Sequence, residues 1–291
     1  MPTTSIKKAV FPVAGLGSRF LPATKASPKE MLPIVDKPLI QYAVEEAVEA
    51  GITDMVFITG RNKRAIVDHF DTAFELESEL EVKKKAELLK IVRNTIPNHV
   101  SCVFIRQPKA LGLGHAVLCA KPVVGNEPFA VILADDMVEN ADGGCLKQMI
   151  EQYEQTGGSI IGVEEVPEDK VSSYGVVDVS DISENAARIK HIVEKPTLAD
   201  APSNLAVIGR YILQPAIIDI LEQTGEGSGG EIQLTDAIEE LAQQEAVHAY
   251  RFSGTRYDCG SKLGFLKATV QYARQHPELG ADFEAFLKGL S

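Results

Sequence analysis

The segment at residues 7–19, KKAVFPVAGLGSR, decides the fold. Its apolar run predicts a buried strand over Lys7–Ala14, and glycines stand at positions 15 and 17, directly behind that strand. A glycine pair in this place lets backbone N–H groups approach a phosphate or a base closely. The segment therefore indicates an α/β protein with a ligand-binding loop behind its first strand.

This loop departs from the dinucleotide-binding pattern. That pattern needs a third glycine, where this chain has Phe20, and then an immediate helix. Instead, Pro22, Pro28 and Pro33 interrupt the next stretch. Asp36 lies at about the right distance for a ribose-binding acid, but it sits in a turn signal rather than at the end of a second strand. We therefore expect no NAD site.

Short apolar runs alternate with segments of helical period along the first half, which is typical of parallel strands covered by helices. Further strands are expected at Met55–Thr59, Val103–Arg106 and Phe129–Ala134, and helices at Leu39–Ala50, Asn62–Phe70 and Glu75–Lys90. From Ser159 onward strands dominate, at Ile160–Val166, Val176–Val179, Ile189–Val193 and Ala206–Leu213. Helices return at Ile232–Gln243, at Lys262–Arg274 and after Pro277. These elements predict an α/β fold with a mixed sheet.

No linker or repeat divides the chain, so one domain over residues 1–291 is expected. Within it, we expect a first half at about residues 7–158, in which strands alternate with helices, and a strand-rich second half at about residues 159–260. The remaining 261–291 form C-terminal helices.

Composition excludes several classes of protein. The 41 acidic and 29 basic side chains give a net charge of −12, which argues against a surface that binds nucleic acid. No apolar stretch reaches the ~18 residues that span a membrane. The start has no signal-peptide core, and the four cysteines are far apart without zinc-site spacing. Reduced thiols in a cytoplasmic protein fit this pattern best.

Cations gather in the loop that follows the glycine pair. Arg19, Lys25 and Lys29 lie within a few residues of it, in an otherwise acidic chain. Positive side chains around a glycine turn favour a polyphosphate ligand, although Lys25 is equally well explained as a solvated charge.

Several long motifs resemble those of the sugar-1-phosphate nucleotidyltransferases. Residues 14–42, AGLGSRFLPATKASPKEMLPIVDKPLIQY, resemble the signature of that family, with Ser18 where threonine is common. Residues 60–71 and 107–117, GRNKRAIVDHFD and QPKALGLGHAV, resemble the bacterial members that act on UTP and glucose 1-phosphate. The resemblance runs from Lys8 to about Tyr272.

This resemblance implies a Rossmann-like three-layer α/β/α fold with a mixed central sheet and a smaller sugar-binding and C-terminal helical part. It implies transfer of a uridylyl group from UTP to glucose 1-phosphate, with Mg²⁺ as cofactor, in a homodimer or homotetramer. Two alternatives stay open: thymidylyl transfer on the same fold, and a catalytically silent sugar-nucleotide-binding regulatory protein. The choice between glucose and galactose also stays open.

The resemblance also assigns roles to residues. Arg19 and Lys29 would contact the triphosphate, and Asp135 and Asp258 would hold the metal. Lys195 would meet the sugar phosphate. The base would be read by Ala14, Gly15, Gln107 and Gly112, and the sugar by Gly175, Glu194 and Glu231. Thr235 is expected to cap the helix that follows it, and Asp136 to have a structural role.

The expected reaction needs no general base. A sugar phosphate has a second pKa of about 6, so at neutral pH it is already ionised and can attack the α-phosphorus directly. The absence of a Ser/His/Asp or Cys/His pattern therefore agrees with this chemistry. The chief requirement is to offset repulsion between two anions.

Overall fold

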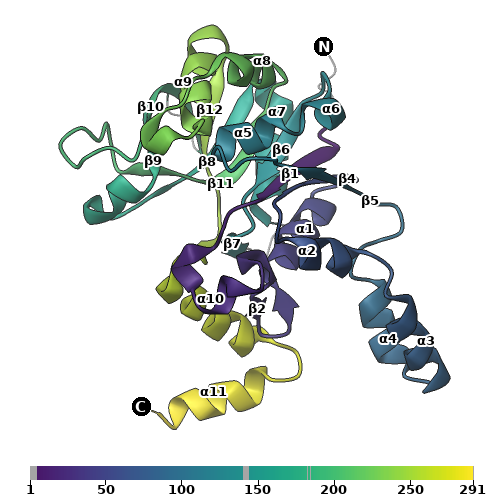
Figure 1. Cartoon of the computed structure of the whole chain (residues 1–291). Coiled ribbons are helices and arrows are strands. Elements are labelled where there is room, and N and C mark those ends of the chain that lie inside the picture. The colour runs from purple at the N-terminus through teal and green to yellow at the C-terminus, as the bar shows by residue number, and fades with distance from the viewer. Residues whose placement is uncertain (1–4, 140–143, 182, 184, 291) are drawn as a thin grey trace.

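The computed structural model describes residues 5–139, 144–181, 183 and 185–290. Across these residues, nine strands form one sheet in the order β5-β4-β1-β6-β11-β8-β12-β10-β9 (Figure 1). Their bounds are β1 Lys8–Val13, β4 Asp54–Thr59, β5 Ser101–Arg106, β6 Phe129–Ile132, β8 Ser159–Glu165, β9 Gly175–Ser180, β10 Ala186–Glu194, β11 Leu205–Leu213 and β12 Val247–Arg251.

The sheet is mixed, which confirms the expected fold class. β5, β4, β1 and β6 are parallel neighbours, as are β8 and β12. β11 runs antiparallel to both β6 and β8, and so joins the strands of the first half to those of the second. One continuous sheet therefore carries both expected halves.

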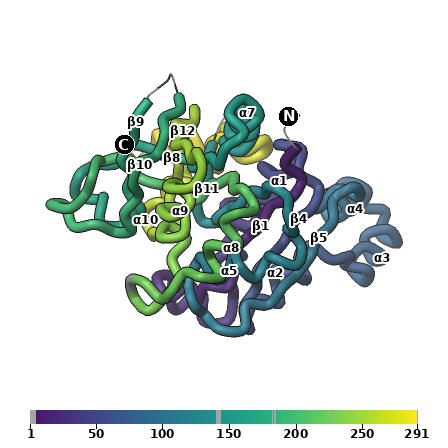
Figure 2. Tube along the Cα trace, turned by 90° about the horizontal axis from the view of Figure 1, so that it is seen from above, coloured from purple at the N-terminus to yellow at the C-terminus, as the bar shows by residue number. Residues whose placement is uncertain are grey.

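Helices cover both faces of this sheet. The helix bounds are α1 Leu39–Glu49, α2 Arg64–Phe70, α3 Phe74–Val82, α4 Ala86–Arg93, α5 Leu113–Leu118, α6 Lys121–Val124, α7 Gly144–Thr156, α8 Ala216–Gln223, α9 Leu234–Gln244, α10 Lys262–Gln275 and α11 Gly280–Lys288. Both views show α3 and α4 extending away from the sheet (Figures 1 and 2).

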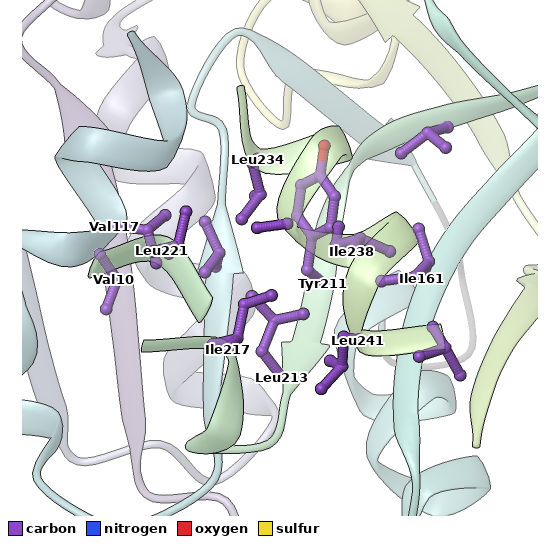
Figure 3. Close-up of a cluster of buried hydrophobic side chains, with 14 of the residues drawn as sticks. Val10, Val117, Ile161, Tyr211, Leu213, Ile217, Leu221, Leu234, Ile238 and Leu241 are labelled. Carbon is purple, nitrogen blue, oxygen red and sulfur yellow. The ribbon is translucent and has the colours of Figure 1, made fainter. Parts of the chain in front are cut away.

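Alternate residues of the strands enter separate cores, because successive side chains of a strand point to opposite faces. Val10 packs with residues of α5, α8 and α9, among them Val117, Leu221 and Ile238 (Figure 3). Its neighbour Phe11 packs on the other face with residues of α1, α2 and α7. Burial on both faces explains why β1 is almost continuously apolar.

A ribbon outside the main sheet positions the metal-site candidates. It pairs β7 (Asp136–Glu139) antiparallel with β13 (Thr255–Asp258). A small cluster that includes Met137, Cys259 and Ala268 of α10 packs beneath it. A second short hairpin pairs β2 (Pro33–Ile34) with β3 (Lys37–Pro38), and Ile34 joins the same cluster. The cluster thus ties the loop behind β1 to the ribbon.

The prediction of a single helix over Glu75–Lys90 is wrong, because two helices, α3 and α4, occupy this segment. The chain turns back on itself between α3 and α4, with Lys84 at φ 56°. Lys85 N donates to Leu80 O and Lys84 N to Glu81 O, the hydrogen bonds of a Schellman helix end. The reversal brings Arg93 onto Glu77 and Glu81, an arrangement that a straight helix cannot make.

In the described part of the chain, no helix combines the length and apolarity needed to cross a membrane. All four cysteines are free thiols, with Cys145 and Cys259 buried and Cys102 and Cys119 partly buried.

Candidate active site

Parallel strands bring candidate residues for the base and for the metal to one edge of the sheet. Ala14 follows β1, Gln107 follows β5 and Asp135 lies three residues beyond β6. Because these strands are parallel, their carboxyl ends meet at the same edge, where open α/β sheets bind their ligands. Residues that lie far apart in the chain therefore meet at the edge of the sheet where the sequence predicted a site.

The loop behind β1 folds into short 3₁₀ turns at Ser18–Phe20, Ala23–Lys25 and Lys29–Met31. Gly17 has a φ of 67°, and a side chain there would meet Lys29 Cβ at 3.1 Å. Thr24 Oγ1 donates to Gly17 O at 2.7 Å. Glycine at this position therefore lets the loop close and bring Lys29 back toward the sheet edge.

The β7–β13 ribbon brings Asp135 and Asp258 together. Asp258 pairs with Asp136 in the ribbon register, and Cys259 N donates to Asp135 O at 2.7 Å. A methyl group on Gly260 would stand 2.9 Å from Asp135 Oδ2 and 2.9 Å from Asp258 Oδ1. Both carboxylates therefore lie next to that position, and any side chain there would crowd them. Arg19 Nη1 lies 3.6 Å from the same point.

Lys29 neutralises Asp135. Its Nζ lies 2.5 Å from Asp135 Oδ2. Burial alone would raise the pKa of Asp135, but Lys29, a backbone hydrogen bond and Arg19 together lower it, so the net pKa falls below its usual range. Burial likewise acts to lower the pKa of Lys29, and Asp135 and Glu30 together raise it above its usual value. Both groups are therefore charged at neutral pH.

These oxygens fit a divalent cation. The described residues hold no cluster of three or more His, Cys, Asp or Glu side chains that could ligate a metal. Mg²⁺ does not need such a cluster, because it is usually held by one or two carboxylates together with substrate phosphates. Asp135 and Asp258, which lie close together beside Gly260, match that requirement.

A cavity of about 760 Å³ opens beside this pair and contains the sugar-side candidates. Arg19, Gly175, Glu194 and Lys195 all line it. Gly175 pairs with Glu194 across β9 and β10, and a side chain at Gly175 would stand 3.3 Å from Glu194 Oε2. The glycine therefore leaves room above that carboxylate for a ligand.

Thr235 does not cap α9 as expected. The helix begins at Leu234 after Gln233, so Thr235 lies within its first turn. Its hydroxyl donates to Glu194 Oε2 at 3.0 Å instead. This bond orients the carboxylate in the cavity, a role that the spacing of the motif does not reveal.

The segment around Gly112 lies against the segment around Glu231. Gly112 has a φ of 97°, and a side chain on it would meet Glu231 Cβ at 2.7 Å. Gln107 Nε2 donates to Gly112 O at 3.1 Å and lies 3.0 Å from His115 Nδ1. Glu231 is exposed, and it lies beside this turn rather than with Glu194 on the cavity wall.

Sequence reasoning missed the charged groups that support the site. Arg256 donates to Asp136 Oδ1 at 2.7 Å and also pairs with Glu164. It lies 5.0 Å from the ring centre of Tyr174, whose hydroxyl donates to Asp258 Oδ2 at 3.4 Å. Burial raises the pKa of Asp136, although Arg256 lowers it. The two carboxylate oxygens of Asp136 accept hydrogen bonds from Arg256 and from Gly209 N.

A further buried ion pair lies behind Lys29. Lys63 Nζ and Glu30 Oε2 are 2.6 Å apart, and the two residues are 5% and 2% exposed. Burial raises the pKa of Glu30 although Lys63 lowers it. The pair joins the loop behind β1 to the loop behind β4. Glu30 lies in the quoted 14–42 segment and Lys63 in the 60–71 segment, but nothing in either motif shows that they meet.

The chain is similar to several known proteins. The family model described as nucleotidyl transferase matches residues 8–275. A Staphylococcus epidermidis protein named UTP–glucose-1-phosphate uridylyltransferase is 54% identical over 285 residues, covering 98% of both chains.

Two solved structures are also similar. A UTP-bound UGPase from Acinetobacter baumannii has a TM-score of 0.92 and 49% identity, covering 98% of this chain and 100% of that one. A UDP-glucose pyrophosphorylase complexed with UDP-glucose has a TM-score of 0.86 and 50% identity, covering 93% and 100%. This chain belongs to the nucleotidyl transferase family.

Proposed function

We propose that this chain transfers a uridylyl group from UTP to glucose 1-phosphate, giving UDP-glucose and pyrophosphate. One observation carries the proposal: the carboxylates Asp135 and Asp258 line the same cavity as Arg19, Glu194 and Lys195, and Lys29 contacts Asp135. The names of the similar proteins support the same substrates.

The reaction is an in-line displacement. An oxygen of the sugar phosphate forms a bond to the α-phosphorus of UTP, and the bond between that phosphorus and the bridging oxygen breaks. Pyrophosphate leaves with the electron pair. Arg19 and Lys29 would bind the triphosphate, and Lys195 would bind the sugar phosphate. These cations reduce repulsion between the two anions and stabilise charge on the leaving group.

The other site residues would orient the substrates. Glu194, held by Thr235, would accept hydrogen bonds from sugar hydroxyls above Gly175. We propose that Ala14, Gly15, Gln107 and Gly112 read the base, because an amide both donates and accepts, as the imide edge of uracil requires. We also propose that Glu231 contacts the sugar.

We propose Mg²⁺ as the cofactor, bound by Asp135 and Asp258. When bound, it would neutralise charge on the reacting phosphates. Replacement of Asp258 by Asn should therefore raise the Mg²⁺ concentration that gives half-maximal activity. A normal Mg²⁺ titration of Asp258→Asn would contradict this assignment.

Pyrophosphate release tests the function. The full chain is incubated with UTP and glucose 1-phosphate, with and without Mg²⁺, and pyrophosphate and UDP-glucose are measured. Parallel reactions contain dTTP in place of UTP or galactose 1-phosphate in place of glucose 1-phosphate. The expected result is Mg²⁺-dependent formation of UDP-glucose. Faster turnover of dTTP would favour thymidylyl transfer, and no turnover of any pair would favour the regulatory alternative.

We also propose that the chain forms a homodimer or homotetramer. Leu266 and Val270 are exposed on one side of α10, and Phe286 is exposed on α11. Apolar surface on neighbouring helices supports self-association. Reduced cysteines support the cytoplasmic location that was expected from the sequence.

A further inference from the structure

Arg210 is a buried arginine that the mechanism above does not use. It lies in β11, beside the bend that joins β6 to β7, and it is 1% exposed. A guanidinium group in such a place needs several partners, because an unpaired buried charge is costly. Those partners show what the residue is for.

The guanidinium group holds the backbone on both sides of Asp135. Arg210 Nη1 donates to Leu133 O at 3.2 Å, and Arg210 Nη2 donates to Asp136 O at 2.7 Å. The neighbouring residue continues the attachment, since Leu133 N donates to Gly209 O at 2.9 Å and Gly209 N donates to Asp136 Oδ2 at 2.7 Å. The bend that presents Asp135 is therefore fixed to β11 at several points.

Glu46 of α1 completes the arrangement. Its carboxylate lies 2.7 Å from Arg210 Nη2 and accepts from Arg210 Nε as well. It also accepts from Leu146 N at 3.0 Å. Well-packed apolar residues can replace a buried ion pair without loss of stability, so stability alone does not require this one. A planar group with five donors, however, is what reaches two carbonyls and a carboxylate at once.

We propose that Arg210 is a positioning residue for the metal site, which fixes the bend around Asp135 and so sets the affinity for a divalent cation. This inference rests on the metal site of the proposed function. Arg210 would not contact the substrates. It acts through the carbonyl groups of Leu133 and Asp136, which lie on either side of Asp135 in the chain.

Two variants test the inference in the full chain. Arg210→Lys keeps the positive charge beside Glu46, but a single ammonium group cannot hold both carbonyls and the carboxylate. The double variant Glu46→Gln with Arg210→Met removes both charges together, so no unpaired charge stays buried. Met149→Ala is the matched control, because Met149 is fully buried in the core cluster that includes Ile208 of β11. Its truncation lowers stability without removing any of the hydrogen bonds that hold the bend.

Metal binding is measured directly, by titrating Mn²⁺ without substrates and following free Mn²⁺ by electron paramagnetic resonance. Thermal unfolding is recorded for every variant. Removing an outer partner of a metal ligand typically weakens metal binding roughly 10-fold to 100-fold. We expect a dissociation constant about 10-fold higher in both Arg210 variants and unchanged in Met149→Ala. The KM for glucose 1-phosphate should stay within about twofold of wild type in Arg210→Lys.

Wild-type affinity for Mn²⁺ in folded Arg210→Lys would overturn the inference, as would an equal loss of affinity in Met149→Ala. If the double variant fails to fold, Arg210→Lys alone decides. A wild-type protein that binds Mn²⁺ but forms no UDP-glucose would refute the proposed function instead, and the comparison of affinities would still stand.

Discussion

Lys195 has a backbone conformation that few lysines adopt. Its φ is 46°, and its N–H donates to Tyr174 O at 2.9 Å directly after β10 ends. A left-handed conformation costs a side chain with a Cβ roughly 1–2 kcal/mol. Here it places the ammonium group 3.1 Å from Glu194 Oε1 on the cavity wall. Strained residues of this kind cluster at functional sites.

Replacement of Lys195 by Ala should lower kcat/KM for glucose 1-phosphate about 100-fold, because a preorganised cation at a reacting phosphate contributes about 3 kcal/mol. The KM for the sugar phosphate should rise and kcat should fall, whereas the KM for UTP changes little. Lys190→Ala is the control, because Lys190 is an exposed residue of β10, the strand that ends directly before Lys195. Steady-state kinetics measure both, and unchanged constants would remove Lys195 from the site.

The thiol of Cys102 should react slowly with iodoacetamide. Burial, together with Asp71, raises its pKa from 9.0 to about 11. A pKa two units higher leaves roughly 100-fold less of the reactive thiolate at pH 8. The alkylation rate, followed by mass spectrometry, should therefore keep rising through pH 10. A plateau near pH 9 would contradict the raised pKa.

The family motifs predicted the charged residues that face the cavity, but not those that hold them in place. The resemblance assigned Asp135 and Asp258 to the metal site before the structure brought them together. Arg210 and Arg256 act through partners 74 and 120 residues away. No local pattern records such a distance, because buried ion pairs depend on which strands become neighbours.

Elements with a clear period were predictable, and short elements were not. β1, β4, β6 and α1 follow the expected ranges within a few residues. The ribbon of β7 and β13 was missed, because each strand has only four residues and gains its partner from across the chain. The site therefore depends on the elements that are hardest to infer from sequence.

Replacement of Lys84 by Gly should stabilise the protein by about 0.5–1 kcal/mol. Lys84 takes the left-handed position of a helix end, which glycine adopts without strain. The same replacement at Lys90, an exposed residue inside α4, should destabilise by about 1 kcal/mol. Urea unfolding measures the two. Equal effects at both positions would show that the turn carries no strain.

The whole molecule is organised around one sheet, with its ligand side made from loops of both halves. Hydrophobic periodicity predicted this mixed α/β architecture, because burial on both faces leaves long apolar runs in the strands. The boundaries near residues 158 and 260 stay a prediction. The order of the strands could not be read from the sequence, since antiparallel β11 enters between β6 and β8 only in the folded chain.

Lysine at both Leu266 and Val270 should convert the proposed oligomer to a monomer, because charge on an apolar contact face is costly to bury. Analytical ultracentrifugation should then give the mass of one chain, 31.5 kDa. Leu198→Lys is the control, because the exposed fraction of Leu198 is 60%, the same as that of Leu266, but Leu198 lies outside α10 and α11. A wild-type protein that already sediments as one chain would contradict self-association.

The pairing of β7 with β13 also bears on how the protein folds during its synthesis. Asp135 emerges from the ribosome well before Asp258, and residues that emerge first generally begin to fold first. The first half of the chain can form its parallel strands before β13 has been synthesised. At that stage Asp135 still lacks Asp258 beside it. The proposed metal site therefore stays incomplete until β13 has been synthesised, and a polypeptide that ends before β13 would have Asp135 without Asp258.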